Sequence, residues 1–166
     1  MKEINQKLLD KIIKKQISVL GNDFESSIMI VRNDGVSLWS NDKNWKMEEK
    51  HSLGALVAGL WSSGSALVDT ITSNGINSQL SMGNSSDGLY LLPISLEGRR
   101  YAFTILYKSS KNPSKLKFKF RLVKKLIEDS YFEESLENDK VEEGKNKTKM
   151  LFNNITDEEI DNLFLL

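Results

Sequence analysis

The stretch LGALVAGLWSSGSALVDTI, residues 53–71, decides the fold of this chain. It forms the main part of a helix that the hydrophobic pattern predicts over residues 46–73. With 100° between successive residues, eight of its positions, seven of them large and apolar, fall within about 60° of one direction. These positions are Leu53, Leu56, Val57, Leu60, Gly64, Leu67, Val68 and Ile71. We expect this predicted core stripe to lie against a β-sheet.

The other side of the same predicted helix carries small, uncharged residues. No charged residue occurs between Ser52 and Val68, whereas a helix face in contact with water normally carries Lys and Glu. Small side chains allow another backbone to approach closely. We therefore predict that this side packs against a second subunit; the alternative is that it is covered within its own chain. The helix residues predicted to make the contact are Ala55, Ala58, Gly59, Ser62, Ser65 and Ala66.

Two short apolar runs before the helix predict a β-hairpin. Residues 26–32 and 36–40 are joined by Asn33-Asp34-Gly35, a turn in which Gly adopts the required positive φ without steric cost. The two faces of the first run carry Ile28 and Ile30, and Met29 and Val31, respectively. Because both faces are apolar, we expect a sheet that is covered on both sides.

Three more strands are predicted after the long helix, over residues 76–82, 89–94 and 100–107. The first alternates apolar and polar residues, which is typical of an edge strand. Its polar residues Asn77 and Gln79 are predicted to join the contact with the second subunit. The last strand, YAFTILY, is apolar on both faces and suits the centre of the sheet. Amphipathic helices are predicted over residues 3–20 and from Pro113 onwards.

The composition excludes several classes of protein. The chain has 166 residues, no Cys, and no apolar run of the roughly 18 residues that span a membrane. Its single histidine, His51, excludes a two-histidine metal site within one chain. Neither a phosphate-binding glycine motif nor the G-x-S-x-G nucleophile motif occurs. We therefore expect a cytoplasmic protein that is not an enzyme and has no catalytic residues, cofactor or metal.

The net charge of zero conceals a division of the chain. Residues 1–132 carry 19 basic and 13 acidic side chains, whereas residues 133–166 carry 4 and 10. Such asymmetry is typical of a folded body with a separate tail. The sequence predicts a domain over residues 1–136, a flexible acidic linker over 137–150 and a docking helix over 151–166.

A basic run extends from Lys111 to Lys125 within the last predicted helix of the domain. At helical spacing these side chains are expected to form a solvated helix face. Docking of the chain's own acidic tail is the alternative. The neutral total charge and the lack of a nucleic-acid-binding motif predict that the chain has no nucleic-acid partner.

The order of the predicted elements is helix, two hairpin strands, long helix, three strands and helix. Together with the Asp34-Gly35 hairpin and the helix LGALVAGLWSSGSALVDTI, this order resembles the roadblock/dynein-light-chain family over about residues 5–132. The resemblance implies a roadblock/profilin-like α+β sandwich. In that fold a five-stranded antiparallel sheet carries the central helix on one face and the two terminal helices on the other.

The same resemblance implies a homodimer, or a heterodimer with a related subunit, joined along the third strand and the central helix. Bacterial relatives of the MglB group regulate a small Ras-like GTPase in gliding and polarity systems, whereas other relatives are scaffolds without a GTPase. The resemblance therefore implies a GTPase partner whose switch loops this chain shapes. The alternative is a scaffold that docks a signalling partner through its tail.

The C-terminal residues predict a short, well-capped helix. Thr156 and Glu159 form a capping box, and Ile155 and Ile160 have the spacing of a hydrophobic staple. An apolar stripe is then made by Ile160, Leu163 and Phe164. A helix of about ten residues is marginal alone, so we expect this segment to fold when it docks in a groove.

The stretch ITDEEIDNLF is similar to the receiver-binding peptide of the flagellar switch protein. The matching residues are Glu159, Ile160, Asp161 and Leu163, with Thr156 in the position of a Ser. Three interpretations of the tail remain open at this point. It binds a receiver domain, another signalling partner, or the body of its own chain.

Overall fold

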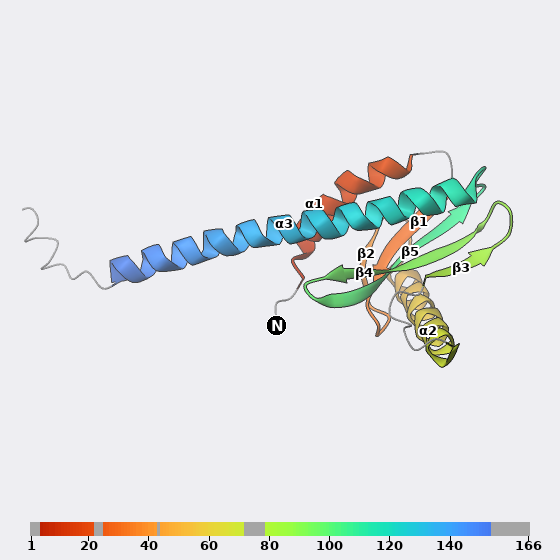
Figure 1. Cartoon of the computed structure of the whole chain (residues 1–166), viewed down its shortest axis with the longest axis horizontal. Coiled ribbons are helices and arrows are strands. Elements are labelled where there is room, and N and C mark those ends of the chain that lie inside the picture. The colour runs from red at the N-terminus through yellow and green to blue at the C-terminus, as the bar shows by residue number, and fades with distance from the viewer. Residues whose placement is uncertain (1–3, 22–24, 43, 72–78, 154–166) are drawn as a thin grey trace, which may run out of the picture. The chain divides into compact units, whose positions relative to one another are not determined.

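The computed structural model describes residues 4–21, 25–42, 44–71 and 79–153 (Figure 1). The chain divides into two units, Met1–Tyr131 and Phe132–Leu166. The first unit contains the five strands that the structure describes, and all five form one sheet. Their bounds are β1 Glu25–Val31, β2 Ser37–Ser40, β3 Leu80–Gly83, β4 Gly88–Leu96 and β5 Arg99–Lys108.

The strand order is β2-β1-β5-β4-β3, and every neighbouring pair is antiparallel. The predicted five-stranded antiparallel sheet is therefore confirmed. β5 lies at its centre and β3 at one edge, as their hydrophobic patterns predict. The predicted strand over 76–82 begins in the structure at Leu80, and residues 76–78 lie outside the described residues.

The helices cover the sheet on both faces (Figure 1). Their bounds are α1 Gln6–Ile17, followed by the 3-10 turn η1 Ser18–Leu20, then α2 Met47–Ile71 and α3 Pro113–Asn153. α2 covers one face, while α1 and the first turns of α3 cover the other. The two sides of β1 follow the predicted alternation, with Ile28 and Ile30 in the α1/α3 layer and Met29 and Val31 in the α2 layer.

Buried side chains form one hydrophobic core on each face of the sheet. The core between the sheet and α1 and α3, the α1/α3 core, is the larger of the two. Phe120 of α3 stacks on Phe103 of β5, with ring centroids 4.1 Å apart and both side chains fully buried. Asn5 caps α1 by accepting a hydrogen bond from the Leu8 amide at 3.1 Å. The Asn5 amide in turn donates to the Tyr131 hydroxyl at 3.1 Å. The start of α1 is thereby joined to α3.

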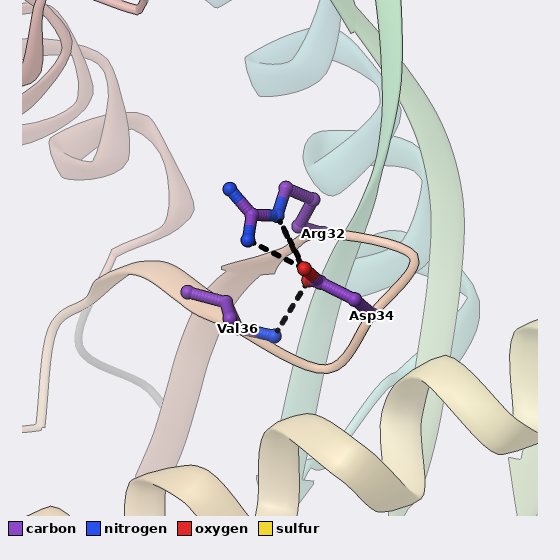
Figure 2. Close-up of polar contacts among 3 residues, drawn as sticks. All are labelled: Arg32, Asp34 and Val36. Carbon is purple, nitrogen blue, oxygen red and sulfur yellow. Dashed lines mark hydrogen bonds and ion pairs between the residues drawn. The ribbon is translucent and has the colours of Figure 1, made fainter.

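The turn of the β1–β2 hairpin is held by Gly35 and by hydrogen bonds to Asp34. Gly35 has φ +86°, the left-handed conformation that the predicted turn requires. Arg32 Nε donates to both carboxylate oxygens of Asp34, at 2.8 and 2.9 Å, and the Val36 amide donates to Asp34 Oδ1 at 3.2 Å (Figure 2). The hydrogen bond from Arg32, with that from the Val36 amide, lowers the pKa of the Asp34 carboxyl to about 2.

α2 meets the sheet through a face that coincides only in part with the predicted core stripe: Leu53, Val57 and Gly64 of the stripe do pack toward the sheet. Gly54, Val57 and Ala58 are buried, whereas Leu56, Leu67 and Ile71 are 69%, 67% and 83% exposed. The assignment of these three large side chains to the core is therefore wrong. The small residues at 54 and 58 let the helix backbone sit close to the hairpin and sheet, and this rotates the largest side chains outward.

The predicted flexible linker over residues 137–150 is also corrected. α3 continues through it to Asn153. Glu and Lys favour the helical backbone nearly as well as Ala, and this segment contains no Pro. The low hydrophobicity of residues 137–150 indicates that few of their side chains are buried, but it does not indicate that the backbone is non-helical. Across the described residues, none of the helices has the length and apolar character to cross a membrane.

Candidate functional site

α2 carries an exposed apolar face in the first unit. Leu56, Leu67 and Ile71 lie on one side of the helix, since their spacings of 11 and 4 residues are close to whole turns. Leu60, between them, is partly buried. A cluster of large apolar side chains on a solvent-facing helix is typical of a surface that binds another protein. We name these four residues the α2 face.

Small residues lie beside the α2 face. Ala55, Gly59, Ser62 and Ala66 are exposed, and Ser65 is partly buried. Ala58 is only 6% exposed and packs against the sheet, so its predicted place in the outward contact is wrong. The reason is the rotation of the helix described above.

The three glycines of α2 differ in what surrounds them. A Cβ on Gly54 would overlap the Gly35 carbonyl oxygen, and a Cβ on Gly64 would overlap the Leu80 side chain of β3. Both glycines therefore serve packing within the chain. A Cβ on Gly59 would meet nothing within 4 Å. Gly in a helix interior costs about 1 kcal/mol relative to Ala, and packing among the described residues does not account for Gly59.

The edge strand β3 lies next to α2, because Leu80 packs where Gly64 has no side chain. Gln79 precedes this strand and is exposed, and it accepts a hydrogen bond from the Tyr90 hydroxyl at 2.6 Å. Met82 is 54% exposed on the same strand. Asn77 lies outside the described residues. Leu80 of β3 therefore lies on the α2 side of the sheet, whereas the hydrogen bond to Tyr90, a residue of the α1/α3 core, directs the Gln79 side chain toward the other side. Among the described strands, β3 has β4 as its one neighbour.

A hollow of about 380 Å³ lies at the N-terminal end of the α2 face. It is lined by Trp45, Glu48, Glu49, Ser52, Leu53 and Leu56. Trp45 and Leu53 pack against the core below it. Glu49 also accepts a hydrogen bond from the Lys46 amide at 2.8 Å, which fixes the first turn of the helix. The apolar α2 face therefore ends in a depression with two carboxylates on its lining.

The C-terminal residues predicted to dock, Ile155, Thr156, Glu159, Ile160, Leu163 and Phe164, all lie outside the described residues. Of the residues predicted for the contact with a second subunit, the structure leaves Ala55, Gly59, Ser62, Ala66 and Gln79 exposed, and the contact itself stays a prediction. The tail stays a prediction.

Sequence reasoning missed the residues with the largest exposed apolar surface, Leu56, Leu67 and Ile71. The hydrophobic period identified them but assigned them to the core. One signal for the correct placement was present in the sequence. With no charge from residue 53 to 68, both sides of the helix are apolar or small, and a period alone does not decide between two such sides.

Comparison with solved structures places this fold among known ones. MglB of Myxococcus xanthus is 15% identical to this chain, covers 82% of it and 95% of its own chain, and superposes with a TM-score of 0.61. The gliding protein MglB of Thermus thermophilus is 15% identical over 80% of this chain and 95% of its own, with a TM-score of 0.56. A structure described as MglB with tetrameric arrangement is 14% identical over 80% and 94%, also at 0.56.

Neither a known protein-family profile nor a curated protein sequence matches this chain. At 14–15% identity the structural likeness establishes the fold. The chain has an MglB-like fold of the roadblock type, and the fold that the sequence resemblance implies is confirmed.

Proposed function

We propose that this chain is a non-catalytic, dimeric protein of the roadblock type that binds a small Ras-like GTPase and regulates it. The observation that carries the proposal is the exposed apolar α2 face with Gly59 beside it. An enzyme surface needs convergent polar groups, whereas this surface offers large aliphatic side chains on a rigid helix.

Burial of the α2 face favours dimerisation. Transfer of a Leu or Ile side chain from water into an interface contributes about 1.5–3 kcal/mol, and each subunit offers several such residues. In a twofold dimer the same surface of both subunits forms the interface, so each position of the α2 face contributes one buried side chain from each subunit. The small side chains at Ala55, Gly59, Ser62 and Ala66 allow the two helix backbones to approach closely. Among the described strands β3 lies at the edge of the sheet, so its outer side supplies backbone groups for pairing across the same interface.

The GTPase partner is supported by the likeness to MglB and by what this sequence lacks. The similar structures are MglB proteins, and one of them is described as a gliding protein. This chain has no phosphate-binding glycine motif, so the nucleotide site belongs to the partner. We place the protein in polarity or motility signalling, where it acts on the switch loops of the GTPase.

Sedimentation velocity tests the dimer. The wild-type chain is expected to sediment as a dimer, and Leu56→Arg or Leu67→Arg as a folded monomer, because a buried unpaired charge is costly. Phe132→Arg is the matched control, since this α3 side chain is similarly exposed, at 65%. It should leave the dimer intact. A wild-type monomer, or a Leu67→Arg dimer, would contradict the proposal.

GTP turnover and nucleotide exchange test the partner. A Ras-like GTPase from the same genome is assayed with the wild-type chain, with Leu67→Arg and with Phe132→Arg. We expect the wild type and the control to change turnover or exchange, and Leu67→Arg to have lost that effect. If no such GTPase responds to the wild-type dimer, the chain is a scaffold that acts without one.

A further inference from the structure

The two faces of the first unit differ in charge. Residues 6–20 and 111–131, which form the layer of α1 and α3, carry eleven basic and three acidic side chains, a net charge of +8. α2, on the other face of the sheet, carries one basic and three acidic side chains, a net charge of −2. The basic side chains of the first unit are therefore concentrated on the α1/α3 side.

The lysines of α1 point away from the sheet. Leu9, Ile12 and Ile13 are the buried residues of this helix. With 100° between successive residues, all four lysines of α1 lie within about 70° of the opposite direction. These lysines are Lys7, Lys11, Lys14 and Lys15, and all of them are exposed. Lys14 also pairs with Asp10 at 2.6 Å.

α3 adds two large apolar side chains to the same side of the molecule. Phe118 and Leu122 are 66% and 42% exposed and are separated by one helical turn. Lys115 and Lys125 are exposed and lie on either side of this pair around the helix. The opposite side of these turns is buried in the α1/α3 core through Leu116, Phe120 and Val123. Since a helix that only covers a sheet needs one apolar side, Phe118 and Leu122 are left for a contact outside the first unit.

Polar contacts hold α1 and α3 together on one face of the sheet (Figure 1). Gln16 Nε2 donates to the Ser130 hydroxyl at 3.2 Å, and Lys119 Nζ donates to the Leu20 carbonyl oxygen at 3.0 Å. The outward sides of the two helices therefore form one surface. We name this surface the basic face and define it as the four lysines of α1 with Lys115, Phe118, Leu122 and Lys125.

We propose that the basic face binds the surface of an anionic lipid bilayer, with Phe118 and Leu122 inserted among the headgroups. Lysines grouped in this number are typical of segments that bind anionic lipid headgroups. Helices that lie in the membrane interface combine Lys with Phe and Leu, because the apolar side chains enter the boundary of the acyl chains while the ammonium groups stay at the headgroups. The basic face offers this combination on two helices that the core holds in place.

The kind of basic residue favours a bilayer over another macromolecule. Ten of the eleven basic side chains in this layer are Lys, and the guanidinium of the other, Arg121, donates from its Nε to the Tyr90 hydroxyl at 2.7 Å. Protein interfaces are enriched in Arg and depleted in Lys. Arg is also the preferred residue for bidentate recognition of nucleic acids, whereas the ammonium of Lys acts as a point charge on a flexible stem.

The separation of charge matters because the whole chain has a net charge of zero. Attraction to an anionic bilayer therefore depends on the orientation in which the basic face meets the headgroups. The inference does not rest on dimerisation through α2 or on a GTPase, because it uses neither surface.

Vesicle flotation of the full chain tests the proposal. We expect binding to vesicles of equal parts phosphatidylcholine and phosphatidylglycerol, and no binding to vesicles of phosphatidylcholine alone. Binding should weaken at least about tenfold when the ionic strength rises from about 0.1 M to about 1 M, because the screening length shortens from about 10 Å to about 3 Å. Equal binding to both kinds of vesicle, or binding to neither, would overturn the proposal. The second result would favour an acidic protein as the partner of the basic face.

Variants of the basic face make the test specific. Lys115→Glu with Lys125→Glu should bind the anionic vesicles at least about tenfold more weakly. Lys46→Glu with Lys108→Glu is the matched control, since these exposed lysines lie outside α1 and α3 and their replacement changes the net charge equally. It should bind as the wild type does. Equal loss in both variants, or no loss in the first, would overturn the proposal.

The apolar pair is tested separately. Phe118→Ser with Leu122→Ser keeps every charge and should also weaken binding at least about tenfold, because apolar insertion contributes to interfacial binding. Wild-type binding by this variant would exclude insertion. The lysine variants cover the case in which this variant fails to fold.

A fluorescent label reports which surface meets the bilayer. The protein has no Cys, so Ser114→Cys and Asp69→Cys each carry a single environment-sensitive fluorophore. Residue 114 is exposed on the Phe118 side of α3, and residue 69 is exposed on α2. With anionic vesicles we expect a blue shift of the emission at residue 114 and an unchanged emission at residue 69. A blue shift at residue 69 alone, or at neither residue in bound protein, would overturn the proposal.

Discussion

Gly54 of α2 lies directly against the carbonyl oxygen of Gly35, so a Cβ at residue 54 would overlap that oxygen. The reverse contact is equally close, because a Cβ on Gly35 would stand 3.0 Å from the Ala55 Cα. A glycine of the helix and a glycine of the hairpin turn thus form one packing unit. This contact turns Gly54, Val57 and Ala58 toward the sheet and leaves Leu56 and Leu67 outside. Ile71, in line with Leu53, is exposed at the C-terminal end of the helix.

Replacement of Gly54 by Ala is expected to destabilise the fold. The added methyl group meets backbone atoms of the hairpin, which do not move aside as a side chain would. Overpacking of this kind costs about 1–3 kcal/mol, and the higher helix propensity of Ala does not compensate for it. Denaturant unfolding measures the change. An unfolding free energy equal to that of the wild type would show that the hairpin and α2 are not packed this closely.

Replacement of Gly59 by Ala is expected to affect association and folding in opposite directions. Its Cβ site is open within the chain, so in the monomeric Leu56→Arg background the variant should gain up to about 1 kcal/mol of unfolding free energy. In the wild-type background the extra methyl groups would separate the two α2 helices and weaken the dimer. Denaturant unfolding and sedimentation equilibrium measure the two effects. A dimer of unchanged affinity would place Gly59 away from the interface.

The sheet could be predicted from the sequence because its signals are local. The two apolar faces of β1, the Asn33-Asp34-Gly35 turn and the alternation of the edge strand each follow from a few neighbouring residues. Antiparallel pairing of β1 with β2, of β3 with β4 and of β4 with β5 joins consecutive strands and needs little further information. The pairing of β1 with β5 joins strands distant in sequence, and no local signal identifies it; the family resemblance implied it.

The orientation of α2 could not be predicted because it depends on a contact distant in sequence. Gly54 and Gly35 are 19 residues apart, and the period of the helix contains no information on which apolar side meets the hairpin. The continuation of α3 beyond residue 136 was missed for another reason. The prediction relied on an apolar face that a helix would bury, and this Glu- and Lys-rich segment has none. It is helical because Glu and Lys have a high intrinsic helix propensity.

The Arg32–Asp34 contact predicts a loss of stability in acid. The folded pKa of Asp34 is about 2, below its ordinary value of 3.8. The stabilisation is therefore fully present above about pH 4 and is lost as the pH falls through about 2. Asp34→Asn should be less stable than the wild type at pH 6, and the two unfolding free energies should converge toward pH 2. Asp129→Asn, at an exposed position of α3, is the control. A pH-independent difference would exclude the ionised carboxylate as the cause.

Removal of the buried hydroxyl group of Thr104 is expected to stabilise the folded protein. This residue of β5 is fully buried, paired with Met29 of β1 and Leu91 of β4, and its Oγ1 has no hydrogen-bond partner among the described residues. A buried hydroxyl without a partner costs about 1–3 kcal/mol. Thr104→Val keeps the shape and should raise the unfolding free energy by about 1 kcal/mol. Thr104→Ser keeps the hydroxyl, loses a methyl group and should lower it by about 1 kcal/mol. If Thr104→Val is instead less stable than the wild type, the hydroxyl has a hydrogen-bond partner in solution, and its loss outweighs the gain from removing it.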